Sequence, residues 1–76
     1  MTTRGEARDA ILAAATRLGE RHGREGKESL RATHNVQYIT RIAAGRAGIP
    51  GNTARAVDPY LVANTYEAAY QAGRMR

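Results

Sequence analysis

Ile42–Val57 has the sequence IAAGRAGIPGNTARAV, and this stretch decides how the chain is expected to fold. Apolar residues recur at helical spacing from Val36 up to it, which predicts a helix there. Gly48 follows the last periodic residue and is a natural left-handed C-cap. Pro50-Gly51-Asn52 is a turn sequence, and Thr53 to Val57 can form a short helix of one to two turns. The stretch therefore predicts a helix, a tight turn and a second helix.

A first helix is expected to precede this corner. Thr2 or Thr3 can cap it, with Glu6 near the capping-box position, and Gly23 is expected to end it. The apolar residues of this segment form one stripe at helical spacing: Ala7, Ile11, Leu12, Ala15 and Leu18. Charged residues fall mainly on the opposite face.

A polar connection, residues 23–34, follows the first helix. It is expected to hold a short turn around Ser29 to Ala32, with Leu30 fixing it to the core. Thr33 or Asn35 can then cap the helix that begins at about Val36.

Asp58-Pro59 predicts the start of the last helix, because aspartate is a good N-cap and proline is favoured at the first helical position. Apolar residues continue at helical spacing to Gly73, where this helix is expected to end. Tyr66 and Tyr70 lie one turn apart on it. Their rings are expected to be buried with exposed hydroxyls; a stacking platform or a partner interface is the alternative.

The expected fold is all-α: one helical domain, residues 1–76, with three substantial helices and a short one. This is a small three-to-four-helix bundle with a helix-turn-helix-like corner. Large apolar residues are few and alanines are many, so the core buries little area per residue. Without a disulfide or metal to stabilise it, such a domain is expected to self-associate, as a homodimer.

Arginine dominates the charge of the chain. The net charge is +5, and eleven of the twelve basic residues are arginine, with Lys27 the lone lysine. Arginine matches phosphate and carboxylate oxygens bidentately, so this balance favours a nucleic acid or another acidic partner. A GC-rich source genome would also favour arginine and alanine, whatever the function.

Several function classes have no support in the sequence. There is no cysteine, and His22 and His34 have no acidic ligand pair nearby, so no metal or cofactor is expected. Ser29 has no triad partners, and catalysis is not expected. No apolar run is long enough for a membrane span, and the first residues, MTTRGEARDA, lack the apolar core of a signal peptide. The expected location is the cytoplasm.

The corner at Gly48 has the spacing of a DNA-binding helix-turn-helix. Such a unit needs a small residue near the end of its first helix and a glycine four residues later, and Ala44 and Gly48 supply this pair. Ala43 and Ala54 stand where larger apolar residues usually pack. This spacing lets two helices cross closely, whatever their function. A corner between two packed helices without a role in DNA binding is therefore the alternative.

Two segments resemble TetR-type DNA-binding domains. Residues 7–23, ARDAILAAATRLGERHG, are similar to the first helix of that family. Residues 46–70, RAGIPGNTARAVDPYLVANTYEAAY, resemble its helix-turn-helix and the start of the next helix, including Pro59. The chain departs from the family in a longer first connection and in the residues that replace the aromatic-His-Phe segment of the recognition helix.

The resemblance implies a set of DNA-binding residues. Gly51, Asn52, Thr53 and Arg55 would face the major groove, and Arg46 would lie near the DNA backbone. We expect Arg46 to anchor a phosphate and Arg55 to contact a base, with Arg41 and Lys27 in secondary roles. The function expected on this basis is a small DNA-binding transcriptional regulator that uses double-stranded DNA as its partner.

A second function from another class remains open. The chain could be a small helical protein that binds another protein, such as an inhibitor of phage or mobile-element origin. In that case the arginines and the Tyr66/Tyr70 edge would form the protein interface, and the corner at Gly48 would be structural only.

Overall fold

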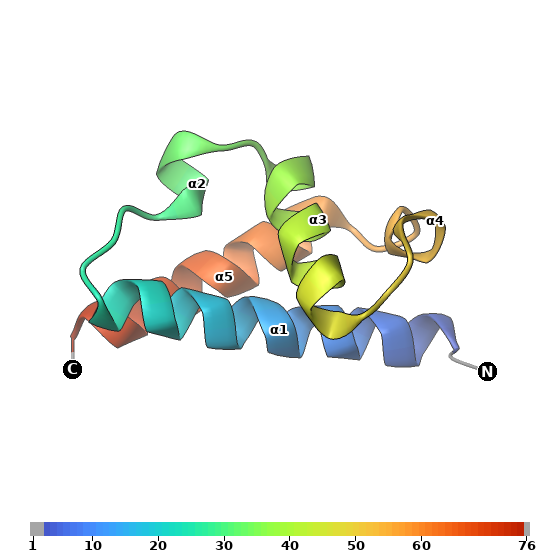
Figure 1. Cartoon of the computed structure of the whole chain (residues 1–76), viewed down its shortest axis with the longest axis horizontal. Helices are drawn as coiled ribbons and strands as arrows, with labels where there is room; N and C mark the ends of the chain where they lie inside the picture. The colour runs from blue at the N-terminus through green and yellow to red at the C-terminus, as the bar shows by residue number, and fades with distance from the viewer. Residues whose placement is uncertain (1–2, 76) are drawn as a thin grey trace.

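Three long helices carry the fold in the computed structural model, which describes residues 3–75. They are α1 (Arg4–Arg24), α3 (Val36–Ala47) and α5 (Pro59–Arg74), and the short helices α2 (Leu30–Thr33) and α4 (Gly51–Ala54) lie between them (Figure 1). The all-α prediction is confirmed. There are two short helices, one more than expected.

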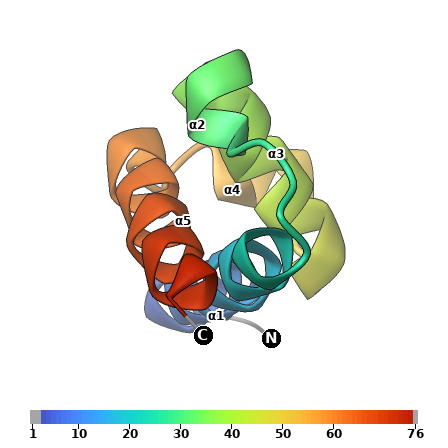
Figure 2. The ribbon, with the colours of Figure 1, turned by 90° about the vertical axis from the view of Figure 1, so that its left-hand side faces the viewer.

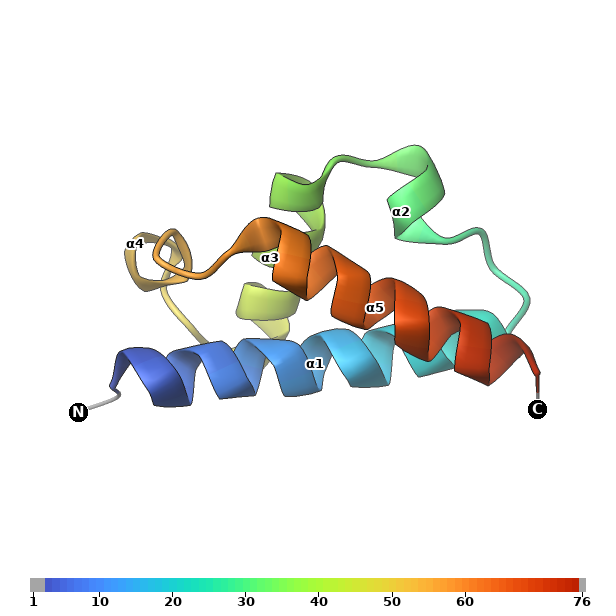
Figure 3. The same cartoon turned by 180° about the vertical axis from the view of Figure 1, so that it is seen from behind.

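The three long helices pack around one core. α1 and α5 run side by side in the same direction and converge toward their C-terminal ends, while α3 crosses over α1 (Figures 1 and 3). Along the length of the molecule, α3 and α5 lie on either side above α1 (Figure 2). α4 lies at the end where the chain begins, and the connection from α1 to α2 lies at the opposite end.

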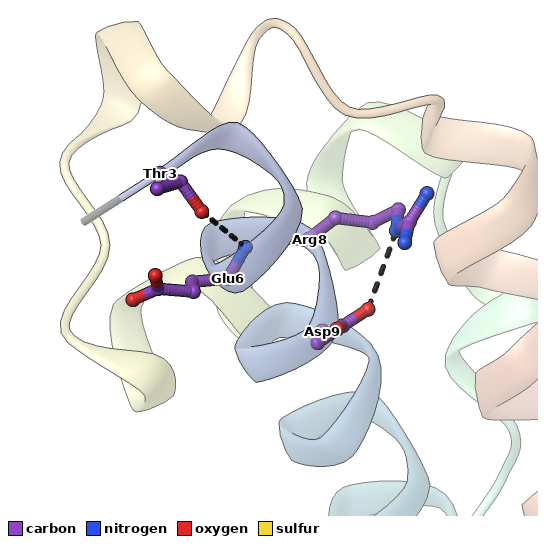
Figure 4. A network of polar contacts seen from close by, with 4 residues as sticks. All are labelled: Thr3, Glu6, Arg8 and Asp9. Carbon is purple, nitrogen blue, oxygen red and sulfur yellow. Dashed lines mark hydrogen bonds and ion pairs between the residues drawn. The ribbon is translucent and has the colours of Figure 1, made fainter.

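The helix starts follow the capping residues that the sequence predicts. Side-chain oxygens of Thr3, Asn35 and Asp58 accept hydrogen bonds from the backbone N–H groups of Glu6, Tyr38 and Tyr60, at 3.1, 2.8 and 2.9 Å. Figure 4 shows the first of these caps. Each cap satisfies a backbone donor that the helix itself leaves unpaired. Of the alternatives, Thr2 lies outside the described residues, and Asn35, not Thr33, caps α3.

The corner after α3 has the predicted left-handed glycine. Gly48 has a φ of 72°, and the N–H of Ile49 donates to the carbonyl of Ala44 at 2.9 Å. The short helix that follows spans residues 51–54, so the prediction of residues 53–57 is wrong. Pro50 itself forms the cap: its carbonyl accepts from the N–H groups of Thr53 and Ala54 at 3.1 and 2.9 Å, so the helix starts directly after it.

Two predicted helix ends are also wrong. Helix α1 continues through Gly23 to Arg24, and α5 continues through Gly73 to Arg74. Both glycines are buried where α1 and α5 cross, each against the backbone of the other helix. The left-handed glycine after α1 is Gly26, with a φ of 71°.

The core lies between the three long helices and is built mainly from alanine and aliphatic residues. Its largest fully buried side chains are Tyr66, Ile11, Ile39 and Val62. Leu30 of α2 packs against this core, as predicted for the connection.

Tyr66 and Tyr70 are both buried, as expected, and their rings stack with centroids 6.3 Å apart. Both hydroxyls are hydrogen-bonded within the protein, which corrects the expectation that they are free at the surface. The hydroxyl of Tyr66 contacts Nδ1 of His22 at 2.6 Å and accepts from the N–H of Leu30 at 3.1 Å, and the hydroxyl of Tyr70 donates to the carbonyl of Lys27 at 2.5 Å. The tyrosines therefore fix the α1–α2 connection, and neither ring is available as a partner interface.

Candidate nucleic-acid interface

The residues expected to face DNA lie on and around α4. Gly51, Asn52 and Arg55 are exposed, and Thr53 is half-buried. The side-chain oxygen of Asn52 accepts from the N–H of Thr53 at 2.9 Å, which holds the first turn of α4. α4 is a single turn, so it presents only a few side chains to a ligand.

A hollow of about 600 Å³ lies between α3, α4 and the start of α5. Arg41 of α3 and Arg55 at the end of α4 both line it, so the structure brings these two predicted residues together. Its lining is otherwise mostly apolar and small, and no carboxylate takes part: the other lining residues are Gln37, Thr40, Ala44, Gly45, Ile49, Gly51, Ala54, Val57 and Pro59. We call it the corner hollow.

Arg46 lies in a different place from Arg41 and Arg55. It lines a second hollow, of about 370 Å³, with three arginines of α1: Arg17, Arg21 and Arg24. We call these four residues the arginine patch. All four are exposed, and the one carboxylate lining this hollow is Glu20.

Sequence reasoning missed the α1 members of the arginine patch, although a signal was present. Arg17, Arg21 and Arg24 are spaced four and three residues apart, which places them on one face of a helix. The sequence places charged residues on the face opposite the apolar stripe and assigns them no role. The sequence could not show that the C-terminal end of α3 would bring Arg46 to it.

Lys27 is distant from the corner. It lies in the α1–α2 connection, at the opposite end of the molecule from α4 (Figure 1). Its Nζ atom is 3.2 Å from a carboxylate oxygen of Glu25. A second ion pair joins Arg8 to Asp9 at 3.3 Å on the first half of α1 (Figure 4).

His22 lies between the arginine patch and the core. Burial lowers the pKa of its imidazole, and the positive charges of Lys27, Arg46 and Arg21 lower it further against the opposing effect of Glu25. Neutral His22 with its proton on Nε2 can accept from the hydroxyl of Tyr66, which itself accepts from the N–H of Leu30. Protonation of His22 would place a hydrogen on Nδ1, so this atom could no longer accept from the hydroxyl of Tyr66.

The structure therefore predicts a pH-dependent stability. The ordinary pKa of histidine, 6.5, applies to the unfolded chain, and the pKa in the folded protein is lower. The unfolded state then binds the proton first, so the stabilisation by neutral His22 is complete above about pH 6.5 and declines below it. We expect the melting temperature to fall between pH 7.5 and pH 5.5, and to fall less steeply in His22→Gln. His34→Gln, a change at an exposed histidine, should retain the wild-type slope; equal slopes in all three proteins would contradict the account.

Comparison of the chain with protein-family models, with curated proteins and with solved structures finds no match. Within residues 3–75, no helix is long and apolar enough to cross a membrane. The same residues contain no group of three histidine, aspartate or glutamate side chains that could hold a metal ion.

Proposed function

We propose that the chain is a small DNA-binding protein that contacts duplex DNA with its α3–α4 corner. The observation that carries this proposal is the distribution of arginines around the C-terminal end of α3. Arg41 and Arg55 line the corner hollow on one side of α3, and the arginine patch lies on another side of this helix. Phosphate contacts of this kind supply nearly all of the affinity of a protein for non-specific DNA.

The proposed interface makes two kinds of contact with DNA, to bases and to phosphates. Arg55, exposed at the end of α4, reaches the edge of a base in the major groove, with Asn52 and Thr53 beside it. Arg46 and the rest of the arginine patch neutralise phosphates and fix the orientation of the domain. Lys27 is left outside this interface because its Nζ atom already pairs with a carboxylate oxygen of Glu25.

The short α4 bears on how the protein would achieve specificity. A recognition segment of one turn reaches few base pairs, so a single copy would discriminate weakly. A homodimer on two half-sites would double the base contacts, and we include self-association in the proposal. The resemblance of residues 7–23 and 46–70 to TetR-type domains supports a role as a cytoplasmic transcriptional regulator.

Substitution of single arginines tests whether Arg55 contacts a base and Arg46 a phosphate. Arg55→Ala should weaken binding to a selected DNA site by about 1–3 kcal/mol and relax the preference at one base pair. Arg46→Ala should weaken binding to all sequences and flatten the dependence of log K on log salt by about one unit. Affinity for selected and random duplexes would be measured by fluorescence anisotropy across a salt series.

Arg8→Ala is the matched control for this experiment. It removes the same charge from an exposed position on α1, but Arg8 pairs with Asp9 and lies outside both hollows. Its DNA affinity should stay close to wild type. If all three variants lose affinity equally, the binding reflects net charge alone and the proposed interface is wrong.

A further inference from the structure

We propose that the corner hollow is a docking site for an acidic amphipathic helix of a partner protein. This inference goes beyond DNA binding and does not depend on it. It rests on the shape, the lining and the charge of the hollow.

The lining combines an apolar floor with a positive rim. Ala44, Ala54 and Val57, which are buried, and the half-buried Ile49 supply the floor, and they belong to α3, α4 and the segments that flank α4. A floor made of small side chains leaves room that no described part of the chain fills. Grooves of this composition accept the apolar face of a helix, whose side chains at i, i+3, i+4 and i+7 enter the groove.

The two arginines at the rim favour a negatively charged occupant. Arg41 and Arg55 line the hollow and no aspartate or glutamate does, so carboxylates on a partner find two guanidinium groups without a competing acid in the lining. The arginines also disfavour a basic partner. A second copy of this chain would bring a further net charge of +5 to the same surface. An acidic helix with an apolar face is the occupant that satisfies both the floor and the rim.

Gly45 provides a sharp test because it lines the hollow on α3. A Cβ added at Gly45 would have no atom of another segment within 4 Å, so Gly45→Leu can extend into the hollow from α3 without displacing the backbone. The substitution leaves every charge in place. It therefore separates binding in the hollow from general attraction to a basic protein.

The probe is a synthetic helical peptide with leucines on one face and glutamates on the other. We expect it to bind the wild-type protein at least about tenfold more tightly than the same peptide with lysine in place of glutamate. Gly45→Leu and the double variant Arg41→Gln/Arg55→Gln should each weaken binding of the glutamate peptide by about tenfold or more. Arg8→Gln should leave it unchanged, and circular dichroism would confirm that each variant is folded.

Three outcomes would overturn the proposal. If folded Gly45→Leu binds the peptide as well as wild type does, the peptide is held elsewhere. If the peptide does not bind but anilinonaphthalene sulfonate does, with the same dependence on Gly45 and the two arginines, the hollow takes a small amphipathic anion. If Gly45→Leu instead dissociates a dimer in sedimentation, the occupant is a second copy. No experiment in this set contains DNA, so its failure is distinct from failure of the DNA-binding proposal.

Discussion

Gly23→Ala is expected to lower the free energy of unfolding by about 3 kcal/mol, a large fraction of the total for a domain of this size. A Cβ at Gly23 would overlap the carbonyl oxygen of Tyr70 and lie 2.9 Å from the backbone nitrogen of Arg74. Both atoms belong to the backbone of α5, so no side chain can rotate away. The helices would have to separate, which would open the packing of α1 against α5 beside Tyr70.

The same argument applies to Gly19 and Gly73, whose added Cβ atoms would overlap the carbonyl oxygens of Tyr66 and Glu20. Gly45→Ala is the matched control, because it is also a helical glycine but has open space around it. Alanine there should raise stability by about 0.5–1 kcal/mol, as its higher helix propensity predicts. Denaturant unfolding followed by circular dichroism measures both. Equal effects at Gly23 and Gly45 would show that α1 and α5 do not cross where the structure places them.

Tyr66 is the second position where a large loss is expected. Tyr66→Ala should cost about 3–5 kcal/mol, since it removes the largest fully buried side chain of the core. Tyr66→Phe retains the ring and should still cost about 1–3 kcal/mol. It leaves the N–H of Leu30 and Nδ1 of His22 without the hydroxyl that bonds both.

Tyr60→Phe is the control for this pair, because Tyr60 is on the same helix with 59% of its surface exposed. Its effect should stay within about 0.5 kcal/mol. The midpoint of denaturant unfolding would be compared among the variants. A Tyr66→Phe protein as stable as Tyr60→Phe would mean that the hydroxyl network contributes nothing to the fold.

Local chemistry accounts for the parts of the fold that the sequence predicted well. The caps at Asn35 and Asp58 and the left-handed Gly48 depend on hydrogen bonds within a few residues, so they can be inferred from the neighbouring sequence. The ends at Gly23 and Gly73 could not be inferred in this way. Glycine is suited both to ending a helix and to a close crossing, and only the position of the other helix decides between them.

In the candidate site, too, some features follow from local sequence and others depend on how the helices pack. Arg55 was assigned from local sequence, whereas its position beside the same hollow as Arg41 depends on how the turn at Gly48 sets α4 against α3. The arginine patch depends on how α3 packs over α1, which spacing along the chain does not reveal. Lys27, expected in a secondary role, lies in the α1–α2 connection away from α4 and pairs with Glu25.

Binding of random duplex DNA across a range of salt concentrations is the most direct test of the proposed function. The arginine patch and Arg55 together predict measurable affinity at low salt. They also predict a slope of log K against log salt of about −4, as expected for four or five neutralised phosphates. Low salt maximises the electrostatic contribution, so absence of binding there would contradict the DNA-binding account outright.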